Sequence, residues 1–189
     1  MTNAQSIIDP NLPIKLMTSD HVEVSLPHKL AVRSNLLKNM LSDMDDLDAL
    51  GPIPLPNIDE AMFKKILSFL EHHKDEEYPE PDPNADEYEE LEKLRQSAVD
   101  PWDREYYGTD VTYMSRIVVA ANYLDIKPLL DLGCKLLAQE IDKCKDDEEI
   151  RAKFGFPDDL SQAEKEQIRK EFAWADLKPP TKPEEGNSE

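Results

Sequence analysis

Alternating hydrophobic and polar residues predict a small antiparallel sheet at the start of the chain. Residues 14–17 and 22–25 alternate on either side of a Ser19-Asp20 turn, and a period of two predicts a hairpin with one buried face. Residues 52–58 hold three prolines around two apolar residues. Because proline has no N–H to donate to a sheet, this segment is predicted to be a short edge strand at most.

Apolar residues three and four positions apart predict two helices in the same part of the chain. The first is marked by Leu37, Met40, Leu41 and Met44. The second carries a stripe formed by Phe63, Ile66, Leu67 and Leu70. Asn57 and Glu60 have the spacing of a capping box, which predicts that the second helix opens at Asn57.

Two more helices are predicted after residue 110, and the second of them is apolar on two separate faces. Pro128 disfavours helix at Lys127 and favours the first turn of a new helix. At about 100° per residue, one face of this new helix holds Leu129, Leu132 and Leu136. The other face holds Leu130, Cys134, Leu137 and Ile141. One face is enough to fix the helix in its own core, so the second needs another partner, from later in the chain or from another protein.

The chain becomes polar from residue 146, and few large apolar side chains follow. They include Ile150, Phe154, Phe156, Ile168, Phe172 and Trp174. Ser161 and Glu164 predict a capping box. Residues 146–176 have too few apolar side chains to fold alone, so they are predicted to lie across the Leu130–Ile141 face and to order further with a partner. Trp174 is interpreted equally as a lid on that face or as an interface anchor.

Three segments are predicted to be disordered: residues 1–12, residues 75–100 and residues 177–189. The middle one is an acidic insertion with eleven acidic and two basic residues, a composition that cannot bury enough apolar surface to fold. Within it, EYEELEKLR (87–95) has pairs that favour a helix, but too little apolar surface to dock firmly.

Composition narrows the classes of partner. The chain has 189 residues and a formal net charge of −19, from 41 acidic and 22 basic residues. We expect no binding to nucleic acid, which needs a basic surface, and none to an anionic membrane. No apolar run could span a bilayer, and no signal peptide is recognisable. Cys134 and Cys144 are expected to be reduced thiols of a cytoplasmic and nuclear protein, ~15 Å apart along a helix and so too distant for a disulfide.

Reactive side chains form no recognisable catalytic or metal-binding pattern. His72 and His73 point about 100° apart on a helix, so they are interpreted as a solvated helix end. Cys134 lies within an apolar face and is interpreted as packing, not as a nucleophile. The acidic residues of 45–48 lack the glycine and glutamate spacing of a calcium loop. We therefore expect no catalytic residue, no metal and no cofactor, and an interaction module instead of an enzyme.

Several segments in order together resemble the Skp-type adaptors of the Skp–cullin–F-box (SCF) ubiquitin ligases. They are IKLMTSD (14–20), PLPNI (54–58), EHHKDE (71–76), PWDREY (101–106), AANYLDIKPLLDLGCK (120–135) and EEIRAKFGFPDDLS (148–161), followed by Trp174. The similarity covers about residues 13–176. The order AANYLDI, LLD and then EEIR is specific to these adaptors, whereas HHKD alone is not. The elongin C relative shares the core but lacks the C-terminal extension.

The resemblance implies an α/β fold of the POZ (BTB) type over residues 13–145, with a small N-terminal sheet packed by helices, and a C-terminal helical extension over residues 146–176. It implies a non-catalytic adaptor that links an F-box substrate receptor to a cullin with its RING protein. Asn122 and Tyr123 match the exposed pair of the family's ANYLD element and are the expected cullin-binding residues. The expected F-box-binding residues are Leu130, Cys134, Leu137, Ile141, Ile150, Phe154, Phe156, Ile168, Phe172 and Trp174.

The chain also departs from the family. Its acidic insertion is long, and Ser115 stands where a large apolar residue is usual. The alternative from another class is a self-associating POZ scaffold protein that binds no cullin, and a weak homodimer is left open. Residues 146–176 discriminate between the two classes, because simple POZ dimers lack such a segment.

Overall fold

The computed structural model describes residues 9–43, 51–77 and 86–172. The chain divides into two compact units, residues 1–154 and residues 155–189, and each is described by itself. The acidic loop at 45–48, Trp174, the tail over 177–189 and most of the predicted N-terminal tail lie outside the described residues. Within the described ranges, no helix is long and apolar enough to cross a membrane.

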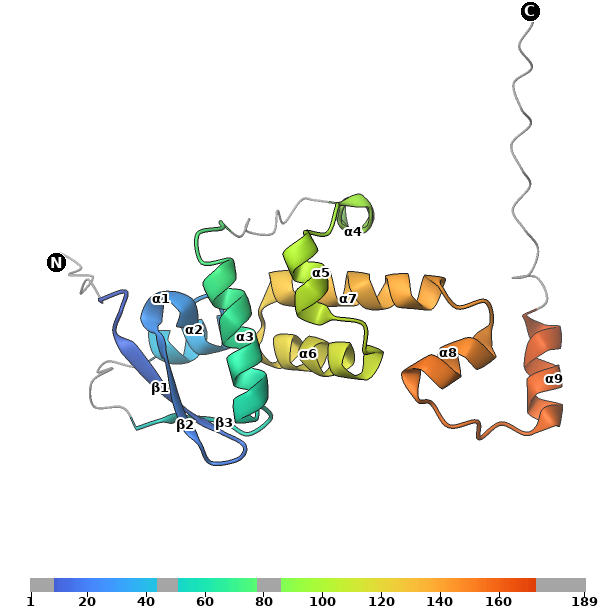
Figure 1. Ribbon diagram of the computed structural model, residues 1–189, viewed down its shortest axis with the longest axis horizontal. Coiled ribbons are helices and arrows are strands. Elements are labelled where there is room, and N and C mark those ends of the chain that lie inside the picture. Colours follow the sequence, from blue (N-terminus) through green and yellow to red (C-terminus); the bar gives the residue numbers. More distant parts are fainter. Residues whose placement is uncertain (1–8, 44–50, 78–85, 173–189) are drawn as a thin grey trace, which may run out of the picture. The chain divides into compact units, whose positions relative to one another are not determined.

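A three-stranded sheet opens the first unit (Figure 1). β1 (Pro13–Thr18) pairs antiparallel with β2 (Glu23–Pro27) and parallel with β3 (Ile53–Leu55), in the order β2-β1-β3. Ile14 and Leu16 of β1 are buried, and Pro54 between the two buried residues of β3 is exposed. The predicted hairpin and the predicted short edge strand are therefore confirmed.

Three helices pack around the sheet: α1 (His28–Ala31), α2 (Asn35–Ser42) and α3 (Glu60–His72). The capping box predicted at Asn57 is wrong. α3 begins later, because Asp59 is its N-cap and accepts a hydrogen bond from the Met62 N–H at 2.7 Å. Asp20, in the hairpin turn, accepts a second one from the Glu60 N–H at 3.1 Å. Two aspartates from different parts of the chain thus accept hydrogen bonds from N–H groups in the first turn of α3.

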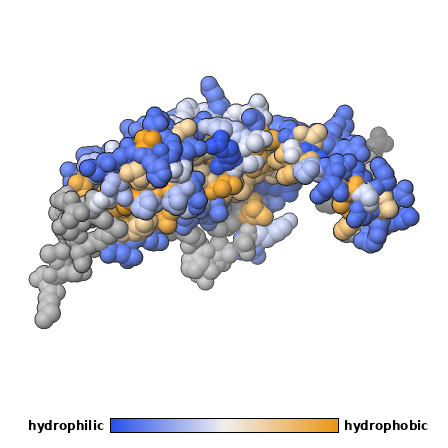
Figure 2. Space-filling model, turned by 90° about the horizontal axis from the view of Figure 1, so that it is seen from below, coloured by the Kyte–Doolittle hydropathy of each residue, from blue (hydrophilic) through white to orange (hydrophobic). Residues whose placement is uncertain are grey.

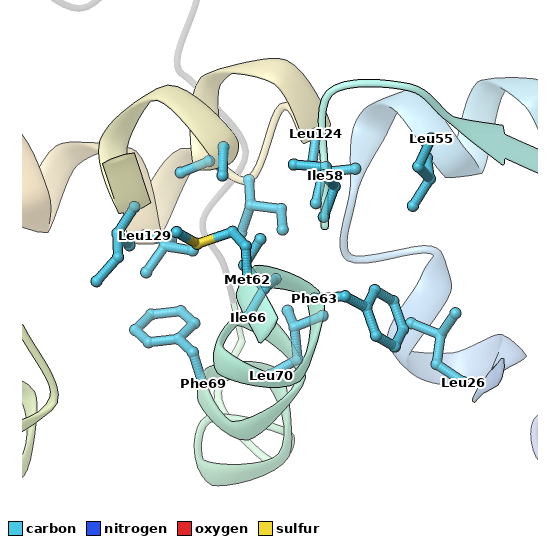
Figure 3. Close-up of a cluster of buried hydrophobic side chains, with 14 of the residues drawn as sticks. Leu26, Leu55, Ile58, Met62, Phe63, Ile66, Phe69, Leu70, Leu124 and Leu129 are labelled. Atoms are coloured by element: carbon cyan, nitrogen blue, oxygen red, sulfur yellow. The ribbon is translucent and has the colours of Figure 1, made fainter. Parts of the chain in front are cut away.

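Three further helices complete the core: α5 (Pro101–Tyr107), α6 (Val111–Leu124) and α7 (Lys127–Asp142). Pro128 lies in the first turn of α7, as predicted. In Figure 3, Met62 and Phe69 of α3 point toward Leu129 of α7, while Phe63 turns toward Leu26. One continuous cluster of buried side chains therefore joins the sheet to the helices, which agrees with the predicted POZ-type α/β fold.

Part of the acidic insertion is helical, which differs from the disorder predicted over residues 75–100. Residues Glu87–Gln96 form α4. Lys135 of α7, which is only 8% exposed, binds the C-terminal end of α4. Its Nζ donates to the Leu94 carbonyl and the Ser97 hydroxyl, each at 2.7 Å, and to the Ser97 carbonyl. Carbonyls at a helix C-terminus attract a cation, so one ammonium group anchors a helix that has little apolar surface.

His73 is 7% exposed, so the prediction of a solvated helix end is wrong for this residue. Its Nδ1 lies 2.8 Å from Glu76 Oε1, and its Nε2 lies 3.0 Å from Asp103 Oδ1. The neighbouring His72 ring stacks on Trp102 with centroids 3.7 Å apart. The first turn of α5 covers the end of α3, and this contact between distant segments is what buries the histidine.

The remaining two helices lie in different units. α8 (Asp147–Phe154) belongs to the first unit and contacts α6. The predicted extension begins at residue 146, whereas the boundary between the compact units falls after Phe154. The second unit contains α9 (Gln162–Glu171). The predicted capping box is confirmed there, because the Ser161 N–H donates to Glu164 Oε2 at 2.9 Å and the Glu164 N–H donates to Ser161 Oγ at 3.4 Å.

Candidate partner-binding surfaces

One side of α6 is left uncovered by the core. Its residues recur at spacings of three and four, and we call them together the α6 surface: Thr112, Ser115, Arg116, Val119, Asn122 and Tyr123. Val119 is 68% exposed, Asn122 is exposed, and Tyr123 is half-buried against the core. Figure 2 views the molecule from below Figure 1, the side on which α6 lies, and shows hydrophobic patches among hydrophilic ones there.

The backbone around Asn122 and Tyr123 is held by an ordered helix end. Asp125 takes the left-handed conformation, with φ 51° and ψ 56°, and its N–H donates to the Asn122 carbonyl at 3.1 Å. The buried Ser34 hydroxyl donates to the Leu124 carbonyl at 2.5 Å and accepts from the Leu37 N–H at 3.2 Å. Ser34 thereby joins the end of α6 to the start of α2. Sequence reasoning missed Ser34, although a serine just before a helix-period stripe is a recognisable N-cap signal.

A hollow of about 360 Å³ adjoins the α6 surface. It is lined by Asn57, Asp59, Met62, Thr112, Ser115, Arg116, Val119 and Ala120. Met62 and Ala120 are buried and form its apolar part. At its edge, Arg116 Nη2 lies 3.0 Å from Asp59 Oδ2, so an ion pair between α6 and the N-cap of α3 borders the hollow.

The second candidate surface is the second face of α7, formed by Leu130, Cys134, Leu137 and Ile141, which we call the α7 stripe. Leu130 and Leu137 pack partly against the core, whereas Cys134 and Ile141 are exposed. On the first face, Leu129 and Leu136 are buried, as the pattern predicts, whereas Leu132 is half-buried. The helix therefore has one face in the core and a second, apolar face that the core covers only in part.

Neither cysteine has the features of a reactive thiol. Partial burial raises the pKa of Cys134, and the charge of Asp131 raises it further, so the thiol stays protonated at neutral pH. The Cys144 thiol donates to the Glu140 carbonyl at 3.4 Å. Both cysteines are free. In the part of the chain that the structure describes, no group of three or more potential ligand side chains could hold a metal ion.

Helix α8 carries Ile150 and Phe154 and contacts α6. Both side chains are half-buried, and Phe154 packs against the core. The connection to α7 is ionic: Lys153 Nζ lies 2.6 Å from Glu140 Oε2, and Lys143 also pairs with Glu140. Hydrogen bonds from Lys143 and Lys153 hold the pKa of Glu140 below its ordinary value, and the hydrogen bond to Glu140 raises the pKa of Lys153.

The other predicted F-box residues lie beyond α8. The second unit carries Phe156, Ile168 and Phe172, which are 58%, 42% and 53% exposed. Ile168 and Phe172 are one turn apart on α9 and at its C-cap. Trp174 lies outside the described residues. The structure therefore brings six of the ten predicted residues onto the neighbouring helices α7 and α8, and three others expose apolar side chains in the second unit.

Comparison with known protein families matches two stretches of the chain. Residues 13–75 match the Skp1 family, tetramerisation domain, and residues 127–175 match the Skp1 family, dimerisation domain. The first match spans the sheet, α1, α2 and α3. The second covers α7, α8 and α9, and the long acidic insertion falls between the two.

Curated relatives are similar over most of the chain. Suppressor of kinetochore protein 1 of Schizosaccharomyces pombe is 42% identical over 163 residues, which is 86% of this chain and 97% of the relative. The E3 ubiquitin ligase complex SCF subunit sconC of Arthroderma benhamiae is 42% identical over 164 residues, 86% of this chain and 94% of the relative. The protein of that name from Aspergillus oryzae is 39% identical over 159 residues, which is 84% of this chain and 93% of the relative.

Proposed function

Because this chain belongs to the Skp1 family, we propose that it is the non-catalytic adaptor of an SCF E3 ubiquitin ligase, linking F-box substrate receptors to a cullin with its RING protein. The observation that carries this proposal is the similarity to a relative named as an SCF subunit, at 42% identity over 94% of that relative's length. An adaptor needs two separate surfaces and no reactive site. The α6 surface and the α7 stripe supply two such surfaces.

We assign the α6 surface to the cullin. Asn122 and Tyr123 occupy its C-terminal end, where the ordered turn at Asp125 and the bond from Ser34 fix the backbone. A half-buried tyrosine offers apolar area and a polar tip, a combination common at the centres of interfaces. A rigid presentation lowers the entropic cost of binding, which supports a role for this pair in contact with a partner.

We assign the α7 stripe, α8 and the second unit to F-box proteins. The stripe leaves Cys134 and Ile141 exposed beside half-buried leucines. The second unit also carries large apolar side chains that are more than two-fifths exposed. Apolar surface of this kind marks sites of protein–protein contact. An amphipathic F-box helix would bury such residues, at roughly 25 cal/mol per Å² of apolar area.

The cullin assignment is tested by replacing Asn122 and Tyr123 together with lysine. A desolvated lysine in the interface has no partner, so we expect cullin affinity to fall at least tenfold while the protein stays folded and its F-box affinity stays unchanged. Affinity is measured by calorimetry with a purified cullin. A control variant, Asn39→Lys with Gln96→Lys, adds the same charge at exposed positions of α2 and α4 and should bind normally. Normal cullin binding by the Asn122/Tyr123 variant would refute the assignment.

Self-association is the competing proposal, and it is favoured by the names of the two matching family domains, which refer to dimerisation and tetramerisation. Light scattering of the chain, with and without a cullin, separates the two. A self-associating chain that binds no cullin would support the scaffold function over the adaptor.

We also propose that the protein acts in the cytoplasm and nucleus, to which its two free thiols are suited, and imaging of a tagged chain tests this.

A further inference from the structure

The hollow beside Ser115 adds a feature to the α6 surface that the pair Asn122 and Tyr123 does not supply. It exists because position 115 carries a small side chain. The neighbouring Thr112 and Val119, one turn before and after, form its walls, and the buried Met62 and Ala120 form its apolar part. A side chain with two or three more carbons at position 115 would project into this space.

The hydroxyl of Ser115 does not face the hollow as a free polar group. Its Oγ donates to the Val111 carbonyl of the same helix at 2.7 Å. Serine in a helix often makes this bond to the carbonyl four residues before it. With the hydroxyl so engaged, Ser115 contributes little more than its small size to the hollow.

The charged side chains at the edge of the hollow also have partners within the protein. Asp59 uses one carboxylate oxygen to cap α3, through the Met62 N–H, and the other to pair with Arg116. This double use holds Arg116 along the edge. The hollow therefore offers an apolar interior with a paired, neutral border, an environment that favours an uncharged apolar side chain over a charged one.

We propose that this hollow receives one large apolar side chain of the cullin, and that Ser115 determines which cullins the chain accepts. The inference rests on the proposed function, because the occupant is identified by continuity with the surface assigned to the cullin. Ser115 and Asn122 lie on the same side of α6, seven residues or ~10 Å apart along its axis. The exposed Val119 lies between them. A partner that covers Asn122 and Tyr123 thus covers the hollow as well.

The test compares two substitutions at one position. Ser115→Leu fills the hollow, and leucine suits a helix, so we expect a folded protein whose affinity for its cullin is at least tenfold lower. Ser115→Ala removes only the hydroxyl that bonds to Val111, so its affinity should stay within twofold of the unaltered chain. Ser115→Gln, which fills the hollow with a polar side chain, should also lose affinity. It replaces Ser115→Leu as the test variant if the leucine variant is unstable.

Thermal midpoint and F-box affinity are measured for every variant, and both should match the unaltered chain. Equal cullin affinity for Ser115→Leu and Ser115→Ala would overturn the role of the hollow and leave the proposed function standing. An unaltered chain that binds none of a panel of purified cullins would overturn both. Loss of affinity in Ser115→Leu toward one cullin with retained affinity for another would support selection by this residue directly.

Discussion

At the scale of single residues, the packing of α7 against α5 and α6 depends on Gly133. A Cβ at this position would lie 2.5 Å from Val118 Cγ2 and 2.8 Å from the Tyr107 hydroxyl oxygen. The Tyr107 hydroxyl cannot easily yield, because it donates to the Leu129 carbonyl at 2.5 Å inside the core. The small residue thus lets α6 and α7 lie side by side (Figure 1) and sets the orientation of the α7 stripe relative to the core.

We expect Gly133→Ala to lower the stability of the protein. The added methyl group overlaps Val118 and Tyr107, and overpacking of this kind costs about 1–3 kcal/mol, more than alanine gains in helix propensity. Thermal unfolding of the full chain measures the change. Gly51→Ala is the matched control, because a Cβ there meets nothing within 4 Å. A Gly133→Ala variant as stable as the unaltered chain would show that the two neighbours move aside freely.

Sequence reasoning failed where the partner is distant in sequence, and among local pairs it succeeded only in part, because Asp59 and not the predicted Asn57 caps α3. The Ser161–Glu164 capping box was predictable, because both members lie within one turn. The anchoring of α4 by Lys135 was not, since its acceptors lie about forty positions earlier. The burial of His73 likewise depends on Asp103. Periodicity describes which face of a helix is apolar, and carries no information about which distant polar groups will meet.

At the scale of elements, α7 organises the first unit. Its first face enters the core, Lys135 holds α4, and Glu140 holds α8. The strands and the longer helices were predictable from local patterns, because burial of one face imposes a period of two or 3.6. The ion pair between Glu140 and Lys153 that joins α7 to α8 was not, because its two members lie 13 positions apart on different helices.

We expect the attachment of α8 to weaken in acid. Hydrogen bonds from Lys143 and Lys153 lower the pKa of Glu140 from its ordinary 4.5, so the folded chain binds this proton less tightly than the unfolded chain. The stabilisation is complete above the ordinary pKa and is lost as pH falls through the folded pKa. The difference in thermal midpoint between the unaltered chain and Glu140→Gln should therefore be largest near neutral pH and shrink below about pH 4.

Glu105→Gln is the control for that measurement, because it removes the same charge from an exposed position of α5. It should lower the midpoint less than Glu140→Gln at neutral pH. A Glu140→Gln variant whose deficit persists unchanged at pH 3 would indicate that the substitution acts through packing and not through the ion pairs with Lys143 and Lys153.

At the scale of the whole molecule, the chain combines a unit with its own core and a unit with little core of its own. In the first, buried side chains from the sheet and six helices form a continuous cluster. In the second, Phe156, Ile168 and Phe172 are exposed by more than two-fifths of their surface, and Leu160 is half-buried. The sequence indicated this imbalance through the scarcity of apolar residues after position 146. It placed the boundary at residue 146, however, because the contacts of Phe154 and Lys153 with the first unit could not be read from spacing.

Deleting residues 155–189 should separate the two functions proposed for the chain. The deletion keeps α8 and the Lys153–Glu140 ion pair, so the remaining protein should unfold at nearly the temperature of the full chain and bind a cullin with unchanged affinity. F-box affinity should fall at least a hundredfold, because Phe156, Ile168, Phe172 and the capped helix α9 are lost. Deleting residues 146–189 is the informative comparison, because it also removes Phe154 from the core and should lower the thermal midpoint as well. A chain ending at Phe154 that binds F-box proteins normally would confine their site to α7 and α8 and exclude a contribution from the second unit.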